Sequence, residues 1–310
     1  MTSAPRAASR PALVYSPGYE LALGAHVFRG EKYAATFARL EQEGWTAMLD
    51  VITPAPAERA DLELVHEPEY LDRLLALRLT PAEQQRLEIP WTAEVAAASL
   101  LAVGGSIAAA QEALRRGWAC NLGGGFHHAF PGHGEGFCAL HDVAVAIHRL
   151  QQEHHAMHTM VIDCDVHQGN GTAVVFAGDP TVFTLSLHQA NNYPALKPPS
   201  CLDVELADGT GDAAYLDTLG AAIRQALHRF TPDMIWYIAG ADPFRDDQLG
   251  GLALSMEGLR ERDRMIFTLA RERHLPVATA LAGGYARRLE DTVSIHAQTV
   301  RCMIAAAESP

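Results

Sequence analysis

Residues 159–172, T-M-V-I-D-C-D-V-H-Q-G-N-G-T, constrain the fold of this 310-residue chain more than any other stretch. The apolar, partly β-branched start predicts a strand, and alternate side chains of a strand share one face. Asp163, Asp165 and His167 would therefore project together, just before a glycine turn at 169–171. Because unpaired buried carboxylates are costly, we expect a divalent-metal site here rather than an edge strand with a hydrogen-bonded histidine.

Apolar strand-like segments alternate with helical segments along the whole chain, which predicts parallel strands joined by crossover helices. We expect an α/β fold, a single-domain three-layer α/β/α architecture with a central mostly parallel sheet, at residues 11–310. Residues 1–10 are expected to be a disordered tail. Predicted strands lie at 12–15, 61–65, 119–122, 161–166, 181–187, 234–239 and 276–281. Predicted helices lie at 32–43, 68–79, 91–116, 141–153, 212–229, 256–273 and 289–306.

Two of these segments carry further expectations. The glycines at 104–105 fall within the predicted helix 91–116, which indicates either a kink or close packing at that point. Residues 191–211 are polar and rich in proline, and we expect them to form the longest irregular segment of the chain.

The composition excludes several classes of protein. A hydrophobic content of 48% suffices for a buried core, and no apolar run is long enough to cross a membrane. The formal net charge of −13 argues against direct binding to nucleic acid. An acidic surface favours cationic ligands, although solubility explains it equally well. Five scattered cysteines without C-x-x-C spacing, and no apolar signal segment near the start, predict a cytoplasmic protein.

Reactive side chains follow the ends of several predicted strands. Ligands of such sheets bind beyond the carboxyl ends of the strands, so these side chains should share one site. They are His127 and His128 after 119–122, Asp165 and His167 at the end of 161–166, Asp242 after 234–239, and Tyr285 after 276–281.

Short motifs that span almost the whole chain point to one protein family. They include V-Y-S-P (14–17), H-E-P-E-Y (66–70), G-G-G-F-H-H-A (123–129), G-E-G-F-C (134–138), D-C-D-V-H-Q-G-N-G (163–171), G-A-D-P-F (240–244) and A-G-G-Y (282–285). With these motifs the sequence resembles the zinc-dependent histone deacetylase family of the arginase–deacetylase superfamily. The G-G-G-F-H-H and H-Q-G-N-G wording is most similar to class IV enzymes and their bacterial relatives.

The resemblance implies one Zn²⁺ per chain, with Asp165, His167 and Asp242 as its ligands. Three protein ligands leave a coordination position open, as in catalytic zinc sites. A two-metal site of the arginase type would need further carboxylates, and position 169 is glycine where D-x-H-x-D would continue. A K⁺ site is also implied, built from the backbone carbonyls of Asp163, Asp165, His167 and Leu187 and the hydroxyl of Ser186.

The resemblance also implies catalytic roles. His128 would act as general base and His127 as its electrostatic partner, oriented by Asp163, although the sequence itself leaves this division open. Tyr285 would donate a hydrogen bond to the developing oxyanion. Asn170 stands where many relatives carry aspartate. Because an amide has no charge, it should support a protonated histidine less.

The substrate expectations come from the same resemblance. Phe137 and Tyr193 would form opposing walls of an acyl-lysine tunnel, and the Gly136 carbonyl would accept from the substrate amide. Residues 81–92 contain no aspartate that could hold a peptide backbone, so selection among peptide substrates should be weak. His26 fits an entrance-loop histidine, and a solvated surface histidine fits it nearly as well.

The function implied is that of an amidohydrolase that removes acetyl or longer acyl groups from lysine side chains of proteins or peptides. A first alternative is deacetylation of small acylated amines such as acetylpolyamines. The short segment at 19–32 disfavours it, because those enzymes carry a long early-loop insertion. A second alternative, a catalytically silent acyl-lysine-binding protein, is disfavoured by the complete set of ligands, histidines and Tyr285.

Overall fold

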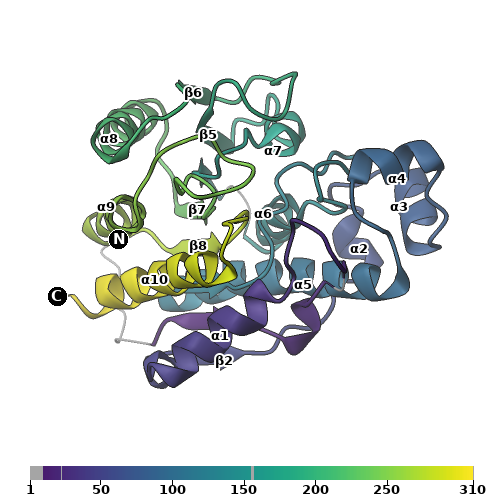
Figure 1. The fold of residues 1–310 in the computed structure, drawn as a ribbon, viewed down its shortest axis with the longest axis horizontal. Coiled ribbons are helices and arrows are strands. Elements are labelled where there is room, and N and C mark those ends of the chain that lie inside the picture. Colours follow the sequence, from purple (N-terminus) through teal and green to yellow (C-terminus); the bar gives the residue numbers. More distant parts are fainter. Residues whose placement is uncertain (1–9, 22, 155–156, 310) are drawn as a thin grey trace.

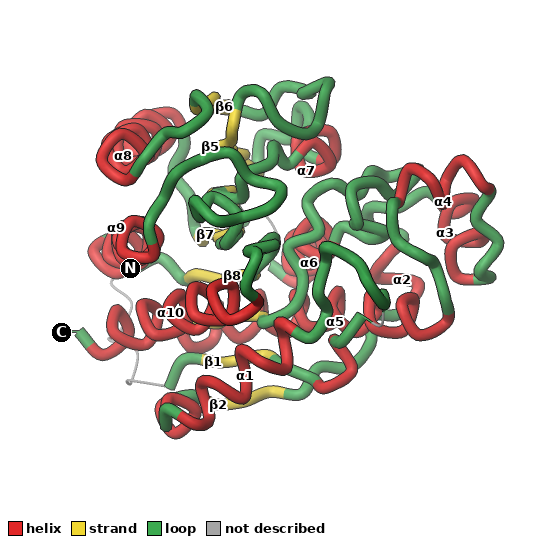
Figure 2. Tube along the Cα trace, viewed as in Figure 1, coloured by secondary structure: helices red, strands yellow, loops and turns green. Residues whose placement is uncertain are grey.

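Eight parallel strands form one sheet in the order β2-β1-β3-β8-β7-β4-β5-β6. The computed structural model describes residues 10–21, 23–154 and 157–309, so nearly all of the predicted tail lies outside the described residues. Helices cover both faces of the sheet (Figures 1 and 2). The predicted three-layer α/β/α architecture is confirmed.

The strands and helices have the following bounds. The strands are β1 (Ala12–Val14), β2 (Asp50–Ile52), β3 (Trp118–Asn121), β4 (Thr159–Asp163), β5 (Val182–Gln189), β6 (Leu202–Leu206), β7 (Met234–Ile238) and β8 (Val277–Ala280). The α-helices are α1 (Lys32–Gln42), α2 (Arg59–Leu62), α3 (Pro68–Leu75), α4 (Pro81–Leu87), α5 (Ala93–Arg116), α6 (Asp142–Glu153), α7 (Asn170–Val175), α8 (Asp212–Arg229), α9 (Met256–Glu272) and α10 (Leu289–Glu308). Two short 3-10 helices lie at Pro17–Tyr19 and Trp45–Met48.

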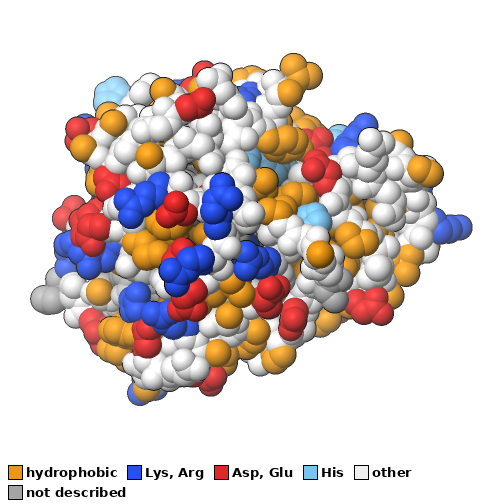
Figure 3. Space-filling view, in the orientation of Figure 1, with side chains coloured by type: hydrophobic (Ala, Val, Ile, Leu, Met, Phe, Trp, Pro, Cys, Tyr) orange, Lys and Arg blue, Asp and Glu red, His pale blue; other side chains and the backbone are white. Residues whose placement is uncertain are grey.

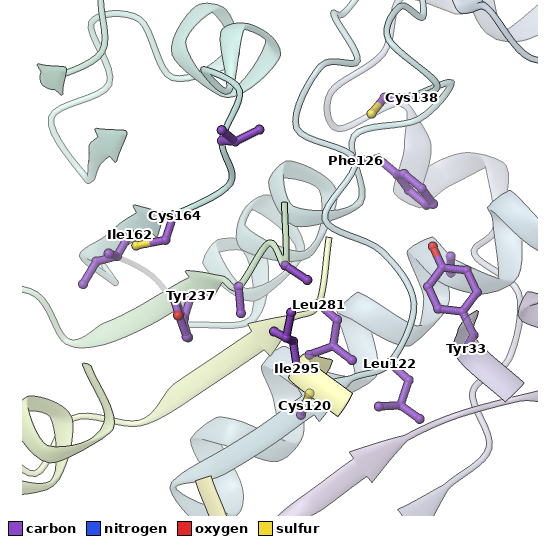
Figure 4. Close-up of a cluster of buried hydrophobic side chains, with 14 of the residues drawn as sticks. Tyr33, Cys120, Leu122, Phe126, Cys138, Ile162, Cys164, Tyr237, Leu281 and Ile295 are labelled. Atoms are coloured by element: carbon purple, nitrogen blue, oxygen red, sulfur yellow. The ribbon is translucent and has the colours of Figure 1, made fainter. Parts of the chain in front are cut away.

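The central strands are buried on both faces, so their alternate side chains enter two separate layers of the core. Ile162 of β4 packs in the layer under α1, α8, α9 and α10, whereas Val161 packs in the layer under α5, α6 and α7. In Figure 4, Ile162, Tyr237 and Ile295 lie in the first of these layers. This double burial explains the continuous apolar runs that predicted the central strands.

Helix α5 is continuous through its two glycines, which resolves the alternative left open by the sequence. A Cβ on Gly104 would lie 1.8 Å from the carbonyl oxygen of Ala55, and one on Gly105 would lie 1.9 Å from the Tyr19 hydroxyl. The glycines therefore serve close packing. Contrary to the expectation from the sequence, α5, alone among the described helices, could cross a membrane by length and composition. However, 61% of its apolar window is buried inside the protein, as in a core helix.

Two predicted segments were wrong. The expected strand 61–65 is instead the end of α2 and a turn, and Glu58 and Asp61 form a capping box at the start of this helix. The segment 191–211, expected to be irregular, contains strand β6, and helix α4 was not predicted. Strand β2 was missed altogether.

Candidate active site

Four neighbouring strands of the sheet carry the predicted site residues on the loops that follow them. These strands are β3, β8, β7 and β4, adjacent in that order. The strand preceding Asp165 and His167 ends at Asp163, so both side chains leave a loop and not the strand that was predicted. The loops meet as expected at the carboxyl edge of the sheet. They line a pocket of about 170 Å³ that contains both histidines of the H-H pair, Asp165, His167 and Tyr285.

Asp165, His167 and Asp242 form a buried cluster at the bottom of this pocket. One potential ligand atom from each lies within 4.8 Å of the others. The Nδ1 atom of His167 lies 3.0 Å from Asp165 Oδ1 and 3.5 Å from Asp242 Oδ2. Asp242 Oδ2 is buried and has no hydrogen-bond partner among the described residues. A Cβ on Gly283 would lie 2.0 Å from this oxygen and 2.5 Å from Asp165 Oδ2, so only glycine leaves the space beside the carboxylates open.

This cluster fits a divalent metal. Two carboxylates and one imidazole are ligands that zinc commonly takes. Burial and the neighbouring Asp165 raise the pKa of Asp242 to about 7, which shows how poorly the bare protein accommodates two charges here. A cation at this point would compensate both carboxylates and satisfy the unpaired oxygen.

Backbone amides and a buried arginine hold in place the loops that carry Asp165, His167 and Asp242. The Val166 amide donates to Asp242 Oδ1 at 2.9 Å, and the Gly283 amide donates to Asp165 Oδ2 at 3.0 Å. Arg262, which the sequence did not single out, is fully buried and donates to the Gly240 carbonyl at 2.6 Å. The loops after β4, β7 and β8 are therefore joined to one another close to the cluster.

The two adjacent histidines have different partners. His127 Nδ1 lies 2.7 Å from Asp163 Oδ2, and His128 Nδ1 lies 2.7 Å from Asn170 Oδ1. Burial lowers the pKa of His127, but Asp163 and Asp165 outweigh it and raise this pKa to about 9. Burial and the positive neighbours lower the pKa of His128 well below its usual value. The arrangement favours a cation at His127 and a neutral ring at His128.

Aromatic rings form the walls of the pocket. The ring of Phe137 lies 6.0 Å from that of Tyr285, and the ring of Tyr193 lies 4.9 Å from that of His128. Gly136, Phe137 and Tyr193, which the resemblance assigns to substrate binding, all line the pocket. Phe28, which was not predicted, also lines it and lies 6.1 Å from Phe137. The pocket is thus a channel with several aromatic rings in its walls, and Asp165 and His167 of the acidic cluster line it.

Two further residues contact the walls of this channel. His26 lies edge-on to Phe137 at 5.1 Å, and its Nε2 lies 3.2 Å from the Glu88 carbonyl oxygen. Lys32 is fully buried behind Tyr285, with its ammonium 5.4 Å from the ring centre and 2.8 Å from the Ala282 carbonyl. A single lysine in a helix carries no pattern that would have revealed this contact.

The comparison with known proteins decides the family. Residues 26–300 match the histone deacetylase domain family. The chain belongs to the histone deacetylase family. An uncharacterized protein of Picosynechococcus is 42% identical over 285 residues, which cover 92% of this chain and 95% of that protein. Histone deacetylase 2 of Arabidopsis thaliana is 32% identical over 92% of this chain and 78% of its own length.

A bacterial relative extends the comparison. The acetoin utilization protein AcuC of Bacillus subtilis is 31% identical over 84% of this chain and 73% of its own length. These matches confirm the family and, with the parallel sheet, the arginase–deacetylase fold. The chain is accordingly a hydrolase of the deacetylase type. Its assignment to class IV stays a prediction.

Proposed function

We propose that this histone deacetylase family member is a zinc-dependent lysine deacylase. The observation that supports it best is the buried Asp165–His167–Asp242 cluster, which lies with two histidines and a tyrosine at the bottom of an aromatic channel. We propose Zn²⁺ as the cofactor, one per chain, held by these three side chains. An acylated lysine of a protein or peptide would enter between Phe137 and Tyr193, and the Gly136 carbonyl would accept from its amide.

The metal supplies two effects when bound, a lowered pKa for a coordinated water and polarisation of the acyl carbonyl. His128, neutral because of its lowered pKa, would take a proton from the water at its Nε2. A histidine of the pair would later give a proton to the departing lysine amine, so that the C–N bond breaks with a neutral amine as the leaving group and the acyl group is released as its carboxylic acid. His127, whose raised pKa favours the cation, would stabilise negative charge beside it. Tyr285 would donate its hydroxyl proton in a hydrogen bond to the oxyanion. Asp163 keeps His127 in orientation through the Nδ1 contact.

Two further proposals accompany the proposed deacylase function, a K⁺ site and a cytoplasmic localisation. Asp163 of β4 pairs with Ser186 of β5, so Ser186 and Leu187 lie close to the loop that carries Asp165 and His167. This pairing supports the K⁺ site that the resemblance implies. The five cysteines are free thiols, which is compatible with the cytoplasmic localisation that we propose.

Acyl release from peptides tests the proposal. Zinc-loaded protein is given one lysine peptide carrying acetyl, lactoyl or long-chain acyl groups, with acetylspermidine as a parallel substrate. Tyr285→Phe should lower kcat by about 10²–10³-fold because one oxyanion donor is lost, and it should still bind zinc. Release from acetylspermidine alone would favour the small-amine alternative, and zinc binding with no release from any substrate would leave only a binding protein.

A further inference from the structure

Glu135 is a carboxylate beside the proposed general base that the proposed chemistry does not use. Its Oε1 accepts from the Tyr193 hydroxyl at 2.7 Å and from Asn170 Nδ2 at 2.6 Å. Its Oε2 lies 3.2 Å from His133 Nε2. The side chain is 17% exposed, so these contacts form at the edge of the protein interior, where water screens them little.

The Asn170 amide has a defined orientation between Glu135 and His128. Its Oδ1 accepts from the Gly171 amide at 3.1 Å and lies 2.7 Å from His128 Nδ1. Its Nδ2 donates to Glu135, and an ionised carboxylate can only accept. Because Oδ1 is an acceptor, Nδ1 of His128 must carry the proton. Nε2 of the neutral ring then keeps the lone pair that a general base requires.

Glu135 is held in its ionised form. Burial works against this, but hydrogen bonds from His133, Tyr193 and Asn170 lower its pKa. A carboxylate that accepts from an amide polarises it and makes its oxygen a stronger acceptor. His127 contacts the carboxylate of Asp163 directly, whereas for His128 the charge lies one amide further away.

We propose that Glu135 is a positioning residue that acts on His128 through the Asn170 amide. The carboxylate fixes the orientation of the amide, and the amide fixes the proton on Nδ1 of the ring. We call Glu135, Asn170 and His128 the relay. The carboxylate oxygen that contacts Asn170 also accepts from the hydroxyl of Tyr193, so the relay contacts one wall of the channel. The catalytic consequence of the relay rests on the proposed function, in which His128 is the base.

Moving the charge from position 135 to position 170 tests the relay. Glu135→Gln should lower kcat for the acetyl-lysine peptide about tenfold with little change in KM, because one charge-assisted contact is lost. Glu135→Gln combined with Asn170→Asp should restore most of this loss, since the new carboxylate accepts directly from His128. Asn170→Asp alone places two carboxylates in contact and should bring no gain.

The matched control is Glu153→Gln, which also removes the charge from a carboxylate that accepts from a side-chain amide, that of Gln111 at 3.1 Å, but on an exposed helix surface. It should keep the wild-type kcat. A kcat for Glu135→Gln equal to wild type would overturn the relay. An equal gain in kcat from Asn170→Asp in wild type and in Glu135→Gln would also overturn the relay, because the effect of the new carboxylate would then be independent of Glu135.

A spectroscopic measurement separates the relay from the proposed function. In ¹⁵N-histidine-labelled protein, nuclear magnetic resonance shows which ring nitrogen of His128 is protonated and how strongly its proton is hydrogen-bonded. The Nδ1 proton should shift upfield in Glu135→Gln and return downfield in the double variant. If wild type releases no acyl group but shows this pattern, the proposed function fails and the relay stands.

The opposite result is equally informative. An active wild type whose His128 signal is unchanged in Glu135→Gln would overturn the relay and keep the deacylase. If Glu135→Gln does not fold, the double variant carries the test. A folded, active double variant with a downfield Nδ1 proton supports the relay, and a folded but inactive one overturns it.

Discussion

At the scale of single residues, several charged groups in this protein lie where they cost stability. Asp242 is buried beside Asp165, and Lys32 is buried with its ammonium 5.4 Å from the centre of the Tyr285 ring. Such groups concentrate at sites where perturbed protonation serves chemistry. The pH dependence of stability distinguishes Asp242 from Lys32, because the pKa of Asp242 is raised and the pKa of Lys32 is lowered.

Asp242 should make the metal-free protein sensitive to pH. Its pKa is raised to about 7 by burial and by Asp165, so the unfolded chain loses this proton at a lower pH than the folded protein does. The folded state therefore loses stability as the pH rises from about 4 through 7. Thermal melts of chelator-treated protein at pH 5 to 8 should show this fall in Tm, and Asp242→Asn should remove most of it.

Added zinc provides the second half of that experiment. It should raise the Tm of wild type, because a ligand that binds only the folded state stabilises it. Asp242→Asn should gain much less, since one of the three proposed ligands is missing. A variant that zinc stabilises as much as wild type would remove Asp242 from the metal site.

Lys32 should have the opposite pH dependence. Burial lowers its pKa from 10.5 to about 8, although the carboxylates of Asp242, Asp165 and Asp247 oppose the shift. Between pH 8 and 10.5 the unfolded chain binds more protons than the folded protein, so stability from this group rises with pH. Relative to Lys32→Met, the free energy of unfolding of wild type should increase by about 2 kcal/mol from pH 7 to pH 10. Denaturant titrations at several pH values measure this difference, and parallel curves would contradict it.

Sequence patterns singled out the three proposed metal ligands and the histidine pair, but not Glu135 or Lys32. The proposed ligands and the histidine pair occur in short motifs, such as D-C-D-V-H and G-A-D. Glu135 also lies in a quoted motif, G-E-G-F-C, yet its importance depends on contacts with Asn170 and Tyr193, which are distant in the sequence. Only the folded chain brings these side chains together.

At the scale of elements, the central strands were predicted and the edge strands were missed. Strands β4 and β7 are buried on both faces and read as apolar runs. The missed strands β2 and β6 form the two edges of the sheet and are partly exposed, so their sequences D-V-I and L-D-V-E-L carry polar residues. The segment 61–65, L-E-L-V after Asp61, alternates like a strand, but the capping box at Glu58 makes it the end of a helix.

The close packing of α5 predicts the effect of adding one methyl group. Gly104→Ala should destabilise the protein by about 1–3 kcal/mol, because the new Cβ would meet the Ala55 carbonyl at 1.8 Å and the backbone must shift. The matched control is Gly220→Ala in α8, where the nearest atom is the flexible end of Arg224 at 3.4 Å. That substitution should stabilise by about 0.5–1 kcal/mol through helix propensity. Denaturant melts compare the two, and equal effects would argue against the packing.

At the scale of the whole molecule, acidic side chains exceed basic ones by 37 to 24. On the face drawn in Figure 3, Lys and Arg side chains are interspersed with Asp and Glu over α9 and α10. On this face the excess of negative charge is therefore not gathered in one patch. Its field extends into solution over about one Debye length, roughly 10 Å at 0.1 M salt.

This field should act on the capture of charged substrates. An acetyl-lysine peptide flanked by Lys or Arg should lose kcat/KM severalfold as salt rises from about 20 mM to 500 mM, because screening removes its attraction to the acidic protein. A peptide flanked by Asp or Glu should show the reverse trend, and a neutral one should change little. Initial rates at low substrate concentration give kcat/KM directly for all three. Because a 170 Å³ channel isolates the buried cluster from bulk salt, the effect belongs to substrate encounter, and kcat should stay constant across the series. Identical salt dependence for the three peptides would show that the net charge plays no part in substrate selection.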